Sequence, residues 1–328
     1  MGKFFRIMGG IICMGLVLVS AGGCDLFPRE QKVLNVTMLL ARGGLGDRSF
    51  NDSAYAGLQE AQRHFDIRFK TVDFTSDQGN VDALRAAAHN GDALIIGVGY
   101  ENVGYIDTVA AEFPDRHFAI LDTEGKGENV ASVVYREPEG DFLMGVLAAM
   151  LTQTGKVGFI GGVEISLLQR MALGFQQGVQ YENGAVEVVT GYAGSFADPD
   201  AGKQLALEQY AGGVDVIYNA AGRSGLGIID AARETGKLTI GTSGDQRYLA
   251  PGNVVGNRPK RLDTAVVTLI REVRDNHFTP GVRSLGLKEG GLAIGPFDPN
   301  LVSTAMQKRL DELQEKIISG EIVVEVQS

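Results

Sequence analysis

Apolar runs and amphipathic stretches alternate along most of this chain. From residue 34 onward, short runs rich in Val, Ile and Leu are followed by longer stretches in which apolar residues return with helical spacing. A continuous apolar run is typical of a strand buried on both faces, and the longer spacing is typical of a helix with one buried face. The alternation therefore predicts repeated strand–helix units that build parallel sheets, the α/β class.

The first series of units predicts one doubly wound lobe over residues 34–135. Its expected helices begin near Asn51, after Gly79 and after Gly99. Its expected strands lie at residues 34–41, 68–74, 93–98, 117–122 and 130–134.

A second lobe of the same kind is predicted over residues 136–245, after a polar interruption at residues 136–141. Its expected strands lie at residues 156–161, 186–193, 214–220 and 238–241, and its expected helices begin at residues 142, 167, 199 and 226. Later expected elements are helices over residues 261–273 and 301–318 and a short strand over residues 321–326. We expect roughly residues 246–275 to cross back into the first lobe and roughly residues 276–328 to close the second.

The beginning of the chain does not follow this rhythm. Lys3 and Arg6 precede an apolar run over residues 7–19, and small residues then lead to Cys24. This order is typical of a secretory signal, and the run is too short for a membrane span. The sequence AGGC at residues 21–24 resembles the bacterial lipobox, in which the cysteine is acylated; a plain cleavage site beside an incidental cysteine is the alternative. We expect a signal peptide over residues 1–23, a lipid on Cys24, a polar tether over residues 24–33, and an exported protein held at the cell membrane.

Composition and charge exclude several function classes. Removing Lys3 and Arg6 with the leader lowers the formal net charge from −10 to −12, because two cations leave and no acid does. No basic cluster remains to attract phosphate backbones, so nucleic acid is not an expected partner. The chain has no G-x-S-x-G or H-E-x-x-H motif, and its four histidines lack metal-ligand spacing. We therefore expect neither an enzyme nor a bound metal or cofactor.

Candidate ligand residues come from the loops that follow the strands, because open parallel sheets bind ligands at the carboxyl ends of their strands. Two lobes in tandem form a crevice between these ends, and we expect hinge closure around a small molecule. Tyr55 and Phe196 belong to opposite lobes, and two such rings can sandwich a flat base. Alternatively, Tyr55 is the first buried position of its helix and Phe196 fills a loop.

Polar candidates carry similar alternatives. Asp47, Asp122 and Asp245 can accept hydrogen bonds from vicinal hydroxyls, or each can cap the helix or turn that follows it. Asn51 is as suited to capping as to binding. Lys260 is either a cation that orients a polar ligand or a solvated charge at a helix start.

Gly222 opens the run GRSGLG at residues 222–227. The order of its glycines is not the dinucleotide-binding pattern. It can instead present backbone N–H groups at a helix start to an anion or a carbonyl.

Taken together, these stretches resemble the basic membrane protein family of bacterial lipoproteins, the purine nucleoside receptor-like substrate-binding proteins of ABC importers. The resemblance is carried by GGLGDRSFND at residues 43–52 with Tyr55, GDFLMG at 140–145, TGKVGFIGG at 154–162, GSFADP at 194–199, AAG at 220–222, PG at 251–252 and KRLD at 260–263. It implies a type I periplasmic-binding-protein-like fold of two lobes and a hinge. It also implies that Tyr55 and Phe196 stack on the base and that Lys260 lies near the ribose.

Two motifs differ from the family pattern. The family often has Asp-Asp where this chain has Gly46 and Asp47, and Asp-x-Asp-Gln where this chain has SGDQ at residues 243–246. Ser243 would therefore meet the ribose as a weaker, uncharged acceptor.

We therefore expect a monomeric, membrane-anchored binding protein that captures a purine nucleoside between its lobes and delivers it to an ABC permease. Three alternatives remain from the sequence: a lipoprotein that binds a sugar or another small polar ligand, an exported nucleoside hydrolase, and a sensory or adhesion lipoprotein without a transporter.

Overall fold

The computed structural model describes residue 2 and residues 33–325. The predicted lipid-bearing Cys24 and, apart from the single residues 2 and 33, the predicted signal peptide and tether lie outside the described residues.

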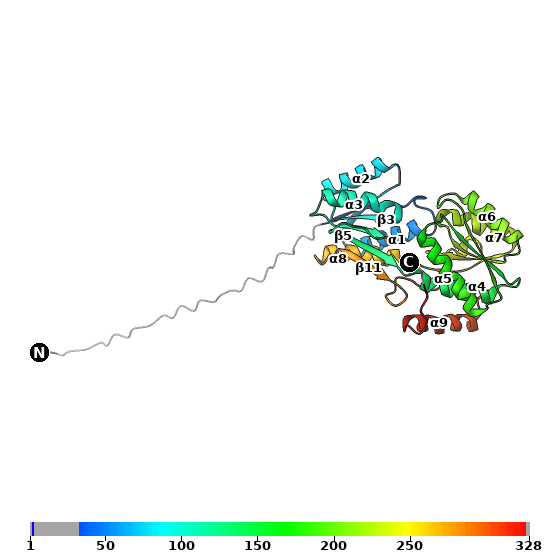
Figure 1. The fold of residues 1–328 in the computed structure, drawn as a ribbon. Helices are drawn as coiled ribbons and strands as arrows, with labels where there is room; N and C mark the ends of the chain where they lie inside the picture. Colours follow the sequence, from blue (N-terminus) through cyan, green and yellow to red (C-terminus); the bar gives the residue numbers. More distant parts are fainter. Residues whose placement is uncertain (1, 3–32, 326–328) are drawn as a thin grey trace. The chain divides into compact units, whose positions relative to one another are not determined.

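The first lobe contains a six-stranded parallel sheet with the strand order β11-β5-β4-β3-β1-β2 (Figure 1). Helices α1 (Phe50–His64) and α8 (Leu262–Arg274) cover one face, and α2 (Asp77–His89) and α3 (Val103–Glu112) cover the other. The strands are β1 (Leu34–Leu39), β2 (Ile67–Val72), β3 (Leu94–Val98), β4 (Phe118–Leu121), β5 (Val130–Tyr135) and β11 (Gly281–Leu285).

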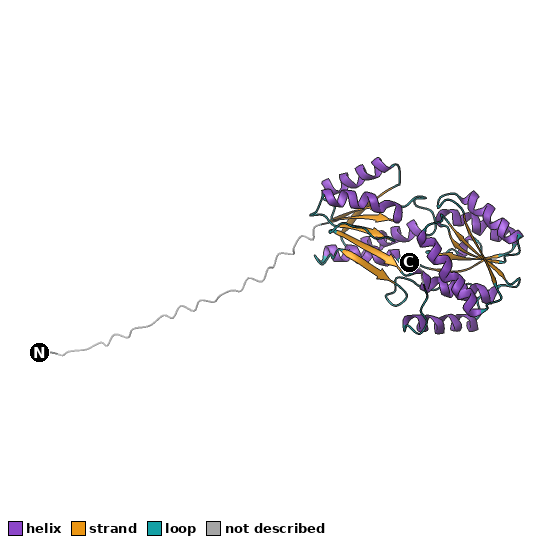
Figure 2. Ribbon diagram, viewed as in Figure 1, coloured by secondary structure: helices purple, strands orange, loops and turns teal. Residues whose placement is uncertain are grey.

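The second lobe contains a five-stranded parallel sheet with the strand order β10-β9-β8-β6-β7. Helices α4 (Glu137–Leu151) and α5 (Ser166–Glu182) cover one face, α6 (Pro199–Ala211) and α7 (Gly225–Thr235) cover the other, and α9 (Thr304–Ile318) packs on α4 (Figure 2). The strands are β6 (Lys156–Gly161), β7 (Glu187–Tyr192), β8 (Val216–Ala220), β9 (Leu238–Thr242) and β10 (Val254–Arg258).

Neighbouring residues of the central strands point to opposite faces and are buried on both. In β3, Ile95 packs among the residues under α2 and α3, whereas Ile96 belongs to the larger core on the α1 and α8 side. This two-sided burial is the reason that the strands read as continuous apolar runs. It confirms the predicted fold class of two α/β lobes with parallel sheets.

The chain passes between the lobes three times within residues 33–325. The first passage joins β5 to α4, the second joins β10 to α8, and the third follows β11 toward α9. These passages lie side by side and form the hinge that positions the site.

The later segments differ from the expected assignment to lobes. Strand β10 falls in the segment expected to join the first lobe, but it extends the second sheet through pairing with β9. Strand β11 falls in the segment expected to close the second lobe, but it pairs with β5 in the first sheet. Helix α8 does pack on the first lobe and α9 on the second, as expected.

Two local predictions were also wrong. Helix α4 begins at Glu137 rather than at residue 142, because Pro138 sits in its first turn, where no intrahelical N–H donor is needed. Residues 321–325 form no strand in the described part of the chain.

Candidate functional site

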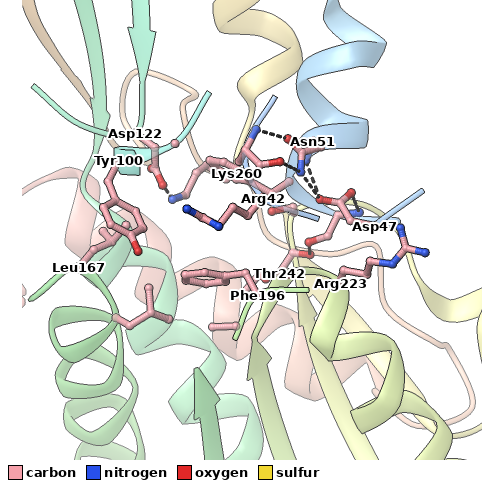
Figure 3. A pocket seen from close by; sticks show the side chains of 18 of the residues that line it. Arg42, Asp47, Asn51, Tyr100, Asp122, Leu167, Phe196, Arg223, Thr242 and Lys260 are labelled. Atoms are coloured by element: carbon pink, nitrogen blue, oxygen red, sulfur yellow. Dashed lines mark hydrogen bonds and ion pairs between the residues drawn. The ribbon is translucent and has the colours of Figure 1, made fainter. Parts of the chain in front are cut away.

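A pocket lies between the lobes, where the carboxyl ends of the two sheets face each other (Figure 3). The β1–α1 loop and the ends of β3 and β4 line it from the first lobe. The start of α5, the ends of β8, β9 and β10 and the loop before α6 line it from the second. The space between these walls, with the solvent at the open mouth included, is about 700 Å³.

Most of the ligand residues predicted from the sequence line this pocket. They are Asp47, Asn51, Asp122, Phe196, Gly222, Ser243 and Lys260. Tyr55 and Asp245 do not line it.

Asp47 is a buried cap of helix α1. Its carboxylate accepts hydrogen bonds from the backbone N–H groups of Ser49 at 2.9 Å, Asn51 at 2.8 Å and Asp52 at 3.1 Å. Burial raises the pKa of Asp47, and these backbone donors oppose that effect. Such bonds satisfy N–H groups that have no partner inside the helix, so the capping interpretation describes Asp47 in this structure.

Asn51 ties the same loop to β1. Its Oδ1 accepts from the backbone N–H of Ala41 at 2.9 Å, and its Nδ2 donates to Asp47 at 3.2 Å. The β1–α1 loop therefore keeps its shape through its own side chains.

Tyr55 lies away from the pocket. It is half-buried, and its ring meets Phe69 of β2 edge-on with centroids 5.7 Å apart. The ring from this helix that does line the pocket belongs to Phe50, at the first residue of α1. Tyr55, which the family resemblance implied would stack on the base, therefore does not line this pocket, whereas Phe50 does.

Phe196 supplies the aromatic ring on the opposite lobe (Figure 3). It packs so closely on the backbone that a Cβ on Gly162 would lie 2.2 Å from the ring. Gly222, which has a φ of 57°, lies beside the same ring and its carbonyl. Glycine is needed at Gly162 by this close approach and at Gly222 by its backbone conformation.

Lys260 lies at the hinge between two carboxylates. Its Nζ is 2.5 Å from Asp122 and 2.8 Å from Glu137, and all three side chains are buried. Burial raises the pKa of Asp122 to about 7 despite the nearby ammonium. Lys260 outweighs the effect of burial on Glu137 and lowers the pKa of that residue, so Asp122 is the carboxyl that titrates near neutrality.

Asp122 and Ser243 share an uncommon backbone conformation. Their φ values are 75° and 65°, in the left-handed region that most side chains avoid. Both residues end strands of the pocket, β4 and β9. Such positions concentrate at binding sites, where the surrounding structure holds them in place.

Asp245 lies outside the pocket in a neighbouring depression. Its two carboxylate oxygens accept from Arg247 at 2.9 and 2.8 Å, and this pairing lowers the pKa of Asp245. In this structure Asp245 therefore stands apart from the pocket between the lobes, with its carboxylate engaged by a neighbour on its own turn.

The sequence interpretation missed the apolar wall of the pocket. Ile165, Leu167, Leu168 and Met171 reach it from the start of α5. These residues have the spacing of an ordinary core-facing helix, so no local signal distinguished them. Phe50 had a signal, since it lies inside the run GGLGDRSFND.

The lobes touch each other across the mouth of the pocket. Arg223 donates from Nη1 to the carbonyl of Gly43 at 3.1 Å, and the Ser49 hydroxyl lies 3.4 Å from the carbonyl of Thr242. In Figure 3, Asp47 and Arg223 lie on one side of the pocket and Tyr100 and Leu167 on the other. The structure therefore represents a closed arrangement of the two lobes.

Residues 33–325 contain no group of three or more His, Cys, Asp or Glu side chains arranged to hold a metal ion. Over the same residues, no helix combines the length and hydropathy that crossing a bilayer demands.

Comparisons with known proteins agree with this architecture. The profile of the family described as "ABC transporter substrate-binding protein PnrA-like" matches residues 34–328. Basic membrane protein A of Borreliella burgdorferi is 34% identical over 329 residues, which cover 97% of this chain and 95% of that protein. A CD4+ T-cell-stimulating antigen of Listeria monocytogenes is 31% identical and covers 98% of both chains.

A solved structure of an ABC transporter solute-binding protein from Aeropyrum pernix superposes with a TM-score of 0.81 at 31% identity, over 90% of this chain and 94% of that one. The family consists of extracytoplasmic solute-binding proteins, which are not an enzyme class and work with a small-molecule ligand and a permease. The chain belongs to the PnrA-like family of ABC transporter substrate-binding proteins.

Proposed function

We propose that this protein captures a nucleoside between its lobes and presents it to the permease of an ABC importer. The observation that carries the proposal is that Phe50 from the first lobe and Phe196 from the second line the same pocket. Flat bases stack on aromatic rings with a gain of roughly 1–3 kcal/mol per base, largely independent of which base it is.

The hinge side of the pocket suits the sugar of a nucleoside. Lys260 and Asp122 place a donor and an acceptor side by side, and vicinal hydroxyls can bond to both. Lys260 Nζ is also 5.6 Å from the centre of the Phe50 ring, so the polar and aromatic parts of the pocket adjoin. A ligand with a flat base and a sugar matches this division.

Membrane attachment through Cys24 is part of the same proposal. A lipid on that residue would keep the binding protein near its permease and raise its local concentration. Labelled palmitate should be incorporated into the full-length chain but not into Cys24→Ser. Equal labelling of both chains would contradict lipid attachment at this position.

Calorimetric titration tests the proposed ligand class. We expect inosine, guanosine or adenosine to bind at least about tenfold more tightly than ribose, because ribose lacks the stacked base. Tight binding of ribose with no binding of any nucleoside would contradict the proposal. Release of free base during prolonged incubation would instead support a hydrolase.

A sugar is the second candidate. The buried Lys260–Asp122 pair favours it, because hydroxyl-rich ligands need such donors and acceptors. The two aromatic rings do not decide between the candidates alone, and the ribose titration separates them.

A further inference from the structure

A buried arginine at the end of β10 forms part of the pocket wall. Arg258 is fully buried, and its guanidinium lies beneath the pocket against β8 and α4. Its Nη2 donates to Asp141 at 2.7 Å and its Nε to the Tyr218 hydroxyl at 3.1 Å. Tyr218 in turn donates to Asp141 at 2.6 Å. This Arg258–Asp141–Tyr218 cluster fixes the orientation of the guanidinium.

One nitrogen of that guanidinium has no partner among residues 33–325. Nη1 is buried, and none of these residues places an acceptor within hydrogen-bonding distance of it. A buried donor on a charged group is strongly unfavourable when it is left without an acceptor. Nε and Nη2 are engaged by the cluster, so Nη1 is the one guanidinium nitrogen left to pair with another group, and Arg258 is among the residues that line the pocket.

The charges around Arg258 indicate what kind of acceptor is needed. Asp141 already pairs with Arg258, and Asp122 and Glu137 already pair with Lys260. Both cations are therefore already paired with carboxylates, so an anionic ligand would be buried beside them without a free cation to pair with it. A neutral oxygen or nitrogen with a free lone pair satisfies Nη1 without that penalty.

We propose that Arg258 is a specificity-determining residue that donates a hydrogen bond from Nη1 to an uncharged acceptor atom of the bound ligand. Asp141 and Tyr218 are positioning residues that aim this donor. The inference deepens the proposed nucleoside function and rests on it. On a nucleoside, the acceptor is either a sugar oxygen or the oxo group of the base.

Inosine and four analogues that each lack one oxygen distinguish these sources. The analogues are 2′-deoxyinosine, 3′-deoxyinosine, 5′-deoxyinosine and purine riboside, which lacks the 6-oxo group. In the wild type we expect one analogue to bind about tenfold or more weakly than inosine, since a hydrogen bond to a charged group is worth about 1.5–3 kcal/mol. If one of the three deoxyribose analogues is the weak binder, the acceptor is the ribose oxygen that it lacks. If purine riboside is the weak binder, the acceptor is the 6-oxo group of the base.

Two variants link that loss to Arg258. Arg258→Lys keeps a cation beside Asp141 and removes Nη1, and Arg258→Met/Asp141→Met replaces the ion pair with apolar side chains of similar size. Replacing both members of a buried pair is often neutral for folding, whereas removing one is not. Arg85→Met, which removes an arginine from an exposed pair with Glu112, is the matched control.

We expect both Arg258 variants to bind inosine about tenfold or more weakly and to lose the discrimination against the sensitive analogue. Arg85→Met should keep both properties. Unchanged inosine affinity in a folded Arg258 variant, or unchanged discrimination, would overturn the inference while leaving the proposed nucleoside function intact.

If the proposed nucleoside function is wrong, the binding measurements on the wild type give a different result. If the wild type binds no nucleoside but binds glucose or ribose, the same variants are compared on that sugar and its monodeoxy analogues, with the same expected loss of discrimination. A wild type that binds none of these neutral ligands overturns both proposals.

Discussion

The two ends of the pocket are built in different ways. At the hinge end, Lys260 and Arg258 are buried and each is paired with buried carboxylates. At the mouth, the lobes meet through half-exposed loops, and the contacts include a single arginine-to-carbonyl hydrogen bond between Arg223 and Gly43. Breaking an ion pair at the hinge end carries a large free-energy penalty, whereas separating the lobes at the mouth carries a small one.

This difference indicates a division of roles. Buried ion pairs contribute little net stability but are strongly unfavourable when one partner is lost, so the hinge end keeps one geometry. Weak contacts at the mouth allow the lobes to separate and close around a ligand. A rigid polar end and an adaptable mouth are what a capture-and-release protein needs.

The largest expected effect comes from breaking the hinge end. Lys260→Met leaves Asp122 and Glu137 buried without their cation, so the free energy of unfolding should fall by about 3–5 kcal/mol. Urea denaturation followed by circular dichroism measures this change. Lys308→Met, at an exposed helix position, should change it by less than about 0.5 kcal/mol. If both substitutions lowered the free energy of unfolding equally, the hinge end would be no more sensitive to loss of a charge than the exposed surface.

The aromatic rings give the next largest effect. Phe50→Ala and Phe196→Ala should each weaken inosine binding by about 1–3 kcal/mol, because each removes one face of the proposed stack. Tyr55→Ala is the control, since Tyr55 packs on Phe69 outside the pocket and its loss should leave affinity within about threefold. A larger loss for Tyr55→Ala than for Phe50→Ala in calorimetric titrations would support the stacking role that the family resemblance implies for Tyr55.

The titration of Asp122 gives a pH signature of the hinge end. Burial raises the pKa of this carboxyl to about 7 in the folded protein, above its value in the unfolded chain. The folded protein then binds more protons, so this contribution to stability is complete at low pH and is lost as the pH rises through about 7.

Asp122→Asn isolates that signature. Asp141, whose pKa burial raises to about 6, acts in the same direction in both proteins and largely cancels in the comparison. The stability of the wild type minus that of the variant should therefore fall between about pH 4 and pH 8. A difference that rises or stays level over that range in denaturation experiments would show that Asp122 remains ionised.

The smallest expected effect lies at the mouth. Arg223→Ala removes the bond to the Gly43 carbonyl, so the closed form should lose about 0.5–1.5 kcal/mol and bound inosine should dissociate several-fold faster. Stopped-flow displacement measures that rate, and the free energy of unfolding should not change. A loss of stability as large as that of Lys260→Met would mean that the mouth is as tightly built as the hinge.

The hydropathy pattern was sufficient to predict strands β1 to β9. It failed at β10 and β11. Strand β10 contains Gly256, Asn257 and the charged Arg258, whose burial depends on Asp141 from a distant helix. Strand β11 is an edge strand with exposed residues such as Val282, so neither strand has a continuous apolar run.

The pocket residues that follow strands could be predicted from the sequence. Which aromatic residue of helix α1 lines the pocket could not be predicted in the same way. Asp122, Phe196, Ser243 and Lys260 all follow or end strands and line the pocket as expected. The family resemblance implied Tyr55, whereas in the structure Phe50, the first residue of α1, is the ring that lines the pocket. Helix boundaries are the least reliable part of a sequence prediction.

The central claim is that a nucleoside base is held between Phe50 and Phe196 with its sugar toward the hinge. A crystal structure of the protein with inosine tests it most directly. We predict density for the purine between the two rings and for the ribose within hydrogen-bonding distance of Lys260 or Asp122. Inosine bound with its base away from either ring, or bound outside the cleft, would contradict the account.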